Sequence, residues 1–318
     1  MRRSTSIRSG APVAILASAL AWVIACAAPP ATEVTWEARM AEGELTRARE
    51  ALERGEHQAG RRHAEQALQL ARDAAALPTV GRALLLLGDL DADLLRLDQA
   101  AATFAFVDEH AGCSAAHIRI AELLLDGGRA GAALSHLALA ADREAQLSND
   151  RIQSARLAAR RHHLAATALR LTGRADAAEA EERQASLALT MLPDNEFLML
   201  RQAVAAARGN DAVAAGKYEE ALRWHARASE TARRLGDGAA ELSAIMALAG
   251  DLVALGRLDD ALHHHLQAMD LARKLGDEAG AVRVARTALA LLDSQPPGDS
   301  RRARFEAELD RAAAAPSR

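Results

Sequence analysis

A block of sequence repeats at an offset of 40 residues, and this repetition limits the fold more than any other feature of the chain. The segment Gly216-Lys-Tyr-Glu-Glu-Ala-Leu222 returns as Gly256-Arg-Leu-Asp-Asp-Ala-Leu262. Further on, Ala-Arg-Arg-Leu-Gly-Asp237 returns as Ala-Arg-Lys-Leu-Gly-Asp277. A repeat of this length predicts a stack of equivalent units, each packed on its neighbours, in place of a single globular core.

The turn glycine of this block extends the pattern along most of the chain. Equivalent turns are predicted at Gly55, Leu95, Gly128, Gly173, Gly216 and Gly256. At seven residues before, five after and twelve after these turns, seventeen of eighteen positions are Ala or Gly, and the exception is Val107. Two antiparallel helices approach closely only where their side chains are small, so the pattern predicts six helix pairs.

The composition agrees with helices and disfavours nucleic acid as a partner. The chain is rich in Ala, Leu and Arg, and only 3% of its residues are aromatic. Such a composition favours helix nearly throughout. A net charge of -4 and the scarcity of aromatic rings argue against binding to duplex or single-stranded nucleic acid.

Residues 247–277 show the pattern most clearly, and they resemble the tetratricopeptide repeat, with a small residue in the first helix and two alanines in the second. The resemblance covers roughly residues 36–292, and the spacing near 40 is similar to kinesin-light-chain-type arrays. It implies an all-α, right-handed superhelical solenoid of about six tetratricopeptide-type helix pairs. Arg47 and Leu95 depart from the family pattern. The resemblance implies a protein-interaction role. It does not name the partner, because the family is defined by its packing and not by a binding site.

The residues beyond the sixth pair predict an end cap. Residues 281–292 look like the first helix of an incomplete seventh pair, and the Pro-rich residues 294–300 break it. Residues 301–315 then place Phe305, Leu309 and Ala312 on one face. We therefore expect residues 293–318 to be a linker and a C-terminal capping helix.

The N-terminus is predicted to be a targeting segment. Three arginines precede an apolar stretch over residues 11–25, and Val23-Ile24-Ala25-Cys26 resembles the lipobox of bacterial lipoproteins. In that family the Cys is lipidated and becomes the first mature residue. This implies a signal peptide over 1–25, a lipidated Cys26 with a tether over 26–35, and a solenoid from residue 36. Ala27 implies sorting to the outer membrane, with the protein on its periplasmic face. An ordinary signal peptide or an uncleaved anchor is the alternative.

Eleven histidines raise the question of a metal site. His225 and His265 lie nine residues after their turns, and His117 and His162 lie eleven residues before theirs, at positions where the family often has a large ring. We therefore predict packed imidazoles and no metal. No motif of nucleophilic, metal-dependent or nucleotide chemistry is present, so we expect no enzyme and no cofactor.

The first helix of each pair lines the inner groove in this family, and helical periodicity gives the residues that should point inward. The candidate partner-binding residues are Arg82, Asp89, Asp93, Glu122, Asp126, Arg160, His163, Arg170, Asn210, Met246 and Val253. Their character changes from acidic through basic to apolar. A partner segment that is basic, then acidic, then apolar would be complementary. The alternative is ordinary variation of a solvated surface.

Together these features predict a periplasm-facing, lipid-anchored scaffold or adaptor for protein–protein interaction in cell-envelope assembly. Its partner would be a protein or peptide segment of an envelope complex, and Cys26 would supply the contact with the membrane. Two alternatives stay open: a regulatory or ligand-binding module for peptidoglycan enzymes, and a structural array that self-associates into a homo-oligomer.

Overall fold

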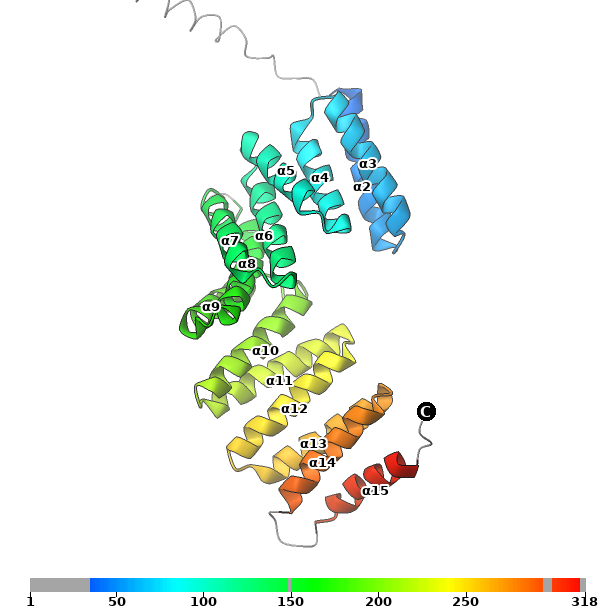
Figure 1. Ribbon diagram of the computed structural model, residues 1–318, viewed down its shortest axis with the longest axis vertical. Helices are drawn as coiled ribbons and strands as arrows, with labels where there is room; N and C mark the ends of the chain where they lie inside the picture. The colour runs from blue at the N-terminus through cyan, green and yellow to red at the C-terminus, as the bar shows by residue number, and fades with distance from the viewer. Residues whose placement is uncertain (1–34, 148–149, 294–298, 315–318) are drawn as a thin grey trace, which may run out of the picture. The chain divides into compact units, whose positions relative to one another are not determined.

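The computed structural model describes residues 35–147, 150–293 and 299–314, and within these ranges the chain forms fourteen helices and no strand (Figure 1). This confirms the predicted all-α helical-repeat solenoid, while its handedness stays a prediction. The predicted signal peptide over 1–25 and the predicted lipidation site at Cys26 lie outside the described residues. The helices are α2 Trp36–Glu53, α3 His57–Asp73, α4 Leu77–Asp91, α5 Leu94–Phe106, α6 His110–Asp126, α7 Ala130–Glu144, α8 Arg151–Leu171, α9 Ala175–Thr190, α10 Leu198–Ala214, α11 Tyr218–Leu235, α12 Gly238–Ala254, α13 Leu258–Lys274, α14 Glu278–Leu292 and α15 Arg301–Ala314.

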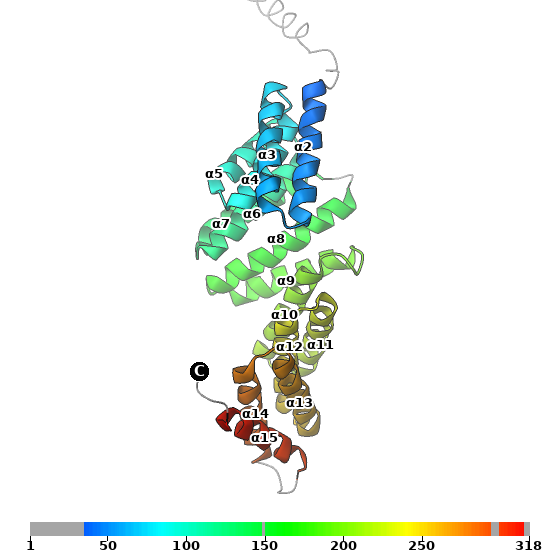
Figure 2. The ribbon, with the colours of Figure 1, turned by 90° about the vertical axis from the view of Figure 1, so that its right-hand side faces the viewer.

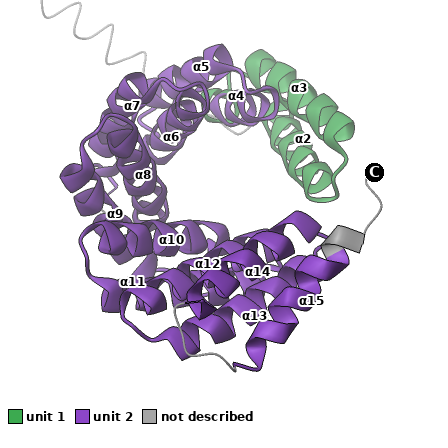
Figure 3. Cartoon of the chain, turned by 60° about the horizontal axis from the view of Figure 1, so that its bottom comes forward, with its two compact units in different colours: residues 1–80 green, residues 81–318 purple. Residues whose placement is uncertain are grey.

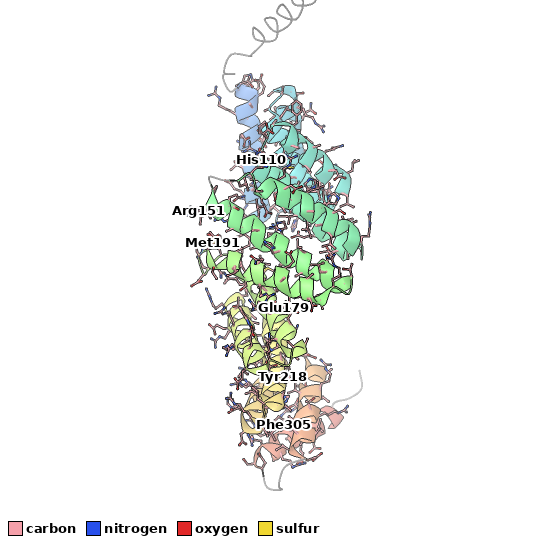
Figure 4. The ribbon with its side chains drawn as sticks, turned by 90° about the vertical axis from the view of Figure 1, so that its left-hand side faces the viewer. His110, Arg151, Glu179, Met191, Tyr218 and Phe305 are labelled. Carbon is pink, nitrogen blue, oxygen red and sulfur yellow. The ribbon has the colours of Figure 1, made fainter. Side chains whose placement is uncertain are left out.

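Consecutive helices form antiparallel pairs, and within residues 81–318 each pair packs on the next. Figure 2 shows α8 beside α9 along their length. Figure 4 places Arg151, at the start of α8, near Met191, just after the end of α9, as an antiparallel pair requires. The seventeen Ala and Gly residues at the predicted close-contact positions are all buried, whereas Val107, the exception in the pattern, is half-buried. Close approach of the two helix axes therefore explains the recurrence of Ala and Gly.

The turn glycines have the left-handed backbone conformation that ends a helix. Gly55, Gly128, Gly173, Gly216 and Gly256 have φ between 70° and 78°. The N–H after each glycine donates to the carbonyl five residues earlier, as from Arg129 to Leu124 at 2.7 Å. Glycine has no side chain and therefore adopts this conformation without strain. These five turns lie where the sequence predicted them.

The second turn is not where the sequence predicted it. Ala92, with φ of 51°, has the turn conformation, and the N–H of Asp93 donates to Gly88 O at 2.9 Å in the same pattern. Leu95 lies in the first turn of α5 and is 66% exposed. The prediction of Leu95 was wrong by three residues, because alanine at Ala92 carried no turn signal.

With the second turn at Ala92, two large residues of α5 fall at close-contact positions, and glycines on the facing helices make room for them. Leu97 and Phe104 now fall at positions where most other pairs have Ala. A Cβ on Gly88 would lie 2.8 Å from Leu97, and a Cβ on Gly81 or Gly112 would lie 2.7 Å from the Phe104 ring. Glycines on the facing helices thus provide the space that small residues provide elsewhere.

The last two helices form a seventh pair. Phe305 of α15, labelled in Figure 4, has no exposed surface and belongs to a buried cluster with Met269, Val284 and Leu292. Leu309 packs at the edge of the same cluster. Arg301 links the start of α15 to Asp259 at 2.7 Å. The side chain of Ala312 lies outside the described residues.

The chain divides into two compact units, Met1–Val80 and Gly81–Arg318 (Figure 3). The described part of the first unit contains α2, α3 and the start of α4. All the candidate groove residues belong to the second unit.

Candidate functional site

The structure places ten of the eleven candidate groove residues on the first helices of their pairs, between α4 and α12. Asp93 is the exception, and it follows from the shifted turn. Its carboxylate accepts from the N–H groups of Leu95 and Arg96 at 2.9 and 3.3 Å, so Asp93 is the N-cap of α5. We correct its assignment from the groove to the cap.

A row of ion pairs joins the acidic candidates to neighbouring arginines. Asp89 of α4 lies 2.5 Å from Arg119 Nε, and Arg119 also donates to Glu122 at 2.9 Å. Glu122 accepts from Arg160 of α8 at 2.7 Å. Burial opposes the charge on Arg119, but hydrogen bonds to Glu122 and Asp89 outweigh it and raise the pKa of the guanidinium. Asp126, at the end of α6, is exposed, and Arg82 of α4 is half-buried.

Arg170 of α8 makes a second set of ion pairs across three helices. It donates to Asp211 of α10 at 2.7 Å and to Glu182 of α9 at 3.1 Å. Glu182 has no exposed surface, and its other oxygen contacts His163 Nδ1 at 2.7 Å. Burial opposes the charge on Arg170, but the hydrogen bond to Asp211 and the charge of Glu182 raise its pKa.

Helix α8 contacts three neighbouring helices through four consecutive side chains. Arg160 reaches Glu122 of α6, and Arg161 donates to the buried Glu144 of α7 at 2.8 Å. The next two residues, His162 and His163, each contact a carboxylate of α9. The predicted basic part of the groove is therefore engaged with the protein's own carboxylates.

A polar contact between residues 19 apart recurs within the helix pairs. Its first member lies eleven residues before the turn, and its second lies eight residues after. In three pairs it joins ionisable side chains at 2.6 to 3.2 Å: Glu44 with His63, His117 with His136, and His162 with Glu181. Burial and the neighbouring His136 lower the pKa of His117. The sequence placed His117 and His162 at ring positions, and the structure adds that each has a polar partner.

His225 is buried as predicted, within a polar cluster that joins three helices. Its Nδ1 lies 2.7 Å from Asp251 of α12, and its Nε2 lies 3.3 Å from Asn210 of α10. Asp251 is 2% exposed, and burial raises its pKa although the hydrogen bond from His225 opposes the shift. Asn210 is exposed on its other side, so this cluster orients a surface amide in the candidate groove.

His265 occupies the equivalent position in the sixth pair without these partners. Gly250 stands where Asn210 stands in the fifth pair, and Leu291 stands where Asp251 does. Nδ1 of His265 is buried without a hydrogen-bond partner among the described residues. Burial, with a smaller contribution from His264, lowers the pKa of His265 to about 4.

The apolar end of the candidate groove contains an open cleft of about 610 Å³ between α12 and α14. Met246, Leu242, Leu275 and Val284 supply its apolar wall, and Ser243, Asp277 and Arg283 its polar rim. Arg283 lies 3.5 Å from Asp277 across that rim. A volume of this size accommodates a few side chains of a peptide. Val253 is half-buried further along α12.

Two neighbouring histidines of α13 have local partners. His263 and His264 contact Gln267 at 2.8 and 3.0 Å. In the ranges that the structure describes, no three His, Cys, Asp or Glu side chains are placed to hold a metal ion. No helix within those ranges has the length and apolar character needed to span a bilayer.

Comparison with known proteins supports the repeat assignment. Residues 201–274 match the family model described as tetratricopeptide repeat, which supports a tetratricopeptide repeat protein with an interaction role. No curated protein matches the chain. The fold is similar to a Signal Transduction ATPase with Numerous Domains protein with a tetratricopeptide repeat sensor from Pyrococcus horikoshii, at 12% identity and a TM-score of 0.55. That match covers 81% of this chain and 38% of the Pyrococcus chain. It is also similar to aspartyl phosphate phosphatase F from Bacillus subtilis, at 14% identity and a TM-score of 0.52, covering 94% and 79% of the two chains.

Proposed function

We propose that this chain is a lipid-anchored, periplasm-facing scaffold that holds a segment of another protein during cell-envelope assembly. The observation that carries the binding part is the open cleft between α12 and α14. It is lined mainly by apolar side chains, it is accessible, and it lies at the predicted apolar end of the groove. Clefts with an apolar wall and a few polar groups are typical binding sites.

The ion pairs refine the expected partner. Asp89, Glu122, Arg160 and Arg170 already contact opposite charges of the same chain. A partner that displaced these contacts would have to replace each of them, which leaves little net gain. We therefore assign the main contact to an apolar side chain of the partner that enters the cleft beside Met246, and we expect weak dependence on salt.

The envelope part of the proposal depends on the lipobox at Val23-Ile24-Ala25-Cys26. A lipid on Cys26 would keep the protein at a membrane surface. Tethering of this kind raises the local concentration of a weakly binding partner by orders of magnitude. A shallow cleft with few polar contacts fits such an arrangement, because it need not bind tightly alone.

Site-specific crosslinking in intact cells tests the proposal. A photoreactive residue replaces the exposed Ser243 at the cleft, and the control replaces the exposed Arg223 of α11. We expect one or two envelope proteins to crosslink at 243 and not at 223. Met246→Glu should abolish those products, and Cys26→Ala should reduce them. Equal products from both positions, or products that persist in Met246→Glu, would refute the cleft. Products that are independent of Cys26 would refute the tether alone.

A further inference from the structure

The first described helix exposes two large apolar side chains that its own pair does not use. Trp36 is 64% exposed and Met40 is 42% exposed. They lie one turn apart on the same face of α2. The face that packs on α3 consists of other residues, namely Ala41, Leu45, Ala48 and Ala51, which are buried.

Local contacts hold Trp36 at the first position of an ordered helix. The Thr35 side chain accepts from the N–H of Ala38 at 3.2 Å and caps α2. The contact of His63 with Glu44, at 2.6 Å, fixes α3 antiparallel to α2. The end of α3 therefore lies beside the start of α2.

The charges around this face balance. Glu37 and Arg39 lie between Trp36 and Met40 on α2, and Arg72 and Asp73 lie at the end of α3. Two acids and two arginines give no net attraction to an anionic surface. Whatever covers Trp36 and Met40 should therefore bind them through apolar contact.

We propose that the Trp36–Met40 face inserts into the lipid–water interface of the membrane that carries the anchor. This inference rests on the proposed lipidation of Cys26. Trp36 follows Cys26 by ten positions, and at about 3.6 Å per position these span at most about 36 Å. The start of α2 therefore stays within about 36 Å of the lipidated thiol, close enough to reach the bilayer surface.

The chemistry of the two side chains selects this occupant. Tryptophan favours membrane interfaces, because its ring is apolar while its indole N–H can reach water or a headgroup. Methionine one turn later adds a flexible apolar side chain at the same depth. Insertion of both would set the direction in which the first helix pair leaves the membrane, which a tether alone cannot do.

Fluorescence of Trp36 in reconstituted vesicles tests the insertion. The full chain is expressed in a lipoprotein-processing bacterium with Trp224→Phe, and mass spectrometry of the purified protein establishes whether Cys26 is lipidated. The protein is then placed in phosphatidylethanolamine–phosphatidylglycerol vesicles with or without brominated acyl chains. If no lipid is found, residues 26–318 with Cys113→Ala are coupled through Cys26 to a maleimide phospholipid, so docking is tested in either case.

We expect brominated chains to quench Trp36, and we expect the quenching to be insensitive to high salt. Met40→Lys should reduce it by more than half, whereas Met199→Lys, at a 76% exposed position of α10, should leave it unchanged. Bound protein whose Trp36 is quenched by aqueous acrylamide as fully as in lipid-free solution would overturn the insertion while leaving the anchor intact. Shielding of Trp36 that grows with protein concentration without lipid would instead assign the face to a second copy of the chain.

Discussion

Replacing Gly81 by alanine tests how the second helix pair accommodates a phenylalanine. A Cβ at Gly81 would lie 2.7 Å from Cε1 and 2.9 Å from Cδ1 of Phe104. The same ring lies 2.7 Å from the Cβ position of Gly112 on α6. Phe104 has no exposed surface, so the ring is confined from both sides and cannot move away from the added methyl group.

The magnitude follows from two opposing terms. Alanine favours a helix interior over glycine by about 1 kcal/mol. Forcing an extra methyl group into a packed core costs about 1–3 kcal/mol. Gly81→Ala should therefore destabilise the protein by up to about 2 kcal/mol. Gly250→Ala in α12, where a Cβ would meet no atom within 4 Å, should stabilise it by about 1 kcal/mol.

Urea and thermal unfolding of the two variants, followed by circular dichroism, test whether Gly81→Ala lowers the stability and Gly250→Ala raises it. A difference of 1 kcal/mol shifts the midpoint temperature of a domain this size by about 2–4 °C. Phe104→Leu in the Gly81→Ala background should recover part of the loss. If Gly81→Ala raises the midpoint as much as Gly250→Ala does, the confinement of Phe104 is wrong.

Three further changes probe the polar contacts. Arg170→Ala removes the guanidinium that pairs with the fully buried Glu182 and should lower the free energy of urea unfolding by about 1–3 kcal/mol. The control Arg183→Ala breaks an exposed pair and should change it by less than about 0.5 kcal/mol. His265 has a folded-state pKa of about 4 and an unfolded value of about 6.5, so the unfolded chain binds more protons and stability falls as pH drops through this window, by at most about 3 kcal/mol. His265→Leu should flatten that part of the pH profile, and an unchanged profile would contradict the assignment. Arg301→Ala should speed amide hydrogen exchange around Phe305, because it removes the ion pair that holds the start of α15, and unchanged exchange would show that the apolar contacts suffice.

The helix pairs could be predicted from the sequence because their signal is local and repeated. Glycine at the turn and small residues at three fixed offsets predict the close approach of two helices. This prediction needs no information about the rest of the chain. The prediction failed at Ala92, where an alanine has the left-handed conformation that glycine has elsewhere. With the turn placed at Leu95, Gly88 and Ala100 fit the small-residue pattern. That placement did not show that Phe104 occupies a close-contact position opposite glycines.

The candidate site was only partly predictable, because its contacts join residues that are far apart in sequence. Asp89 and Arg119 are 30 residues apart, and Arg170 and Asp211 are 41 apart. Helical periodicity gives the face on which a side chain lies but not which neighbour it reaches. The contact between residues 19 apart could have been found, since Glu44–His63 and His162–Glu181 show the same spacing and complementary chemistry.

That 19-residue contact has a consequence for the choice of partners among similar helices. Its chemistry differs from pair to pair: in the fifth pair Trp224 packs against a cluster containing Ala205, and in the sixth His264 and Ile245 line one cleft. A first helix moved into another pair would therefore often face a different residue at this position, although α11 and α13 are close copies in sequence. In a chain of similar helices, pairing of a helix with the wrong partner would compete with folding. Contact residues that differ from pair to pair disfavour such wrong pairing. Recombination of such arrays should accordingly succeed when whole pairs are exchanged and fail when single helices are.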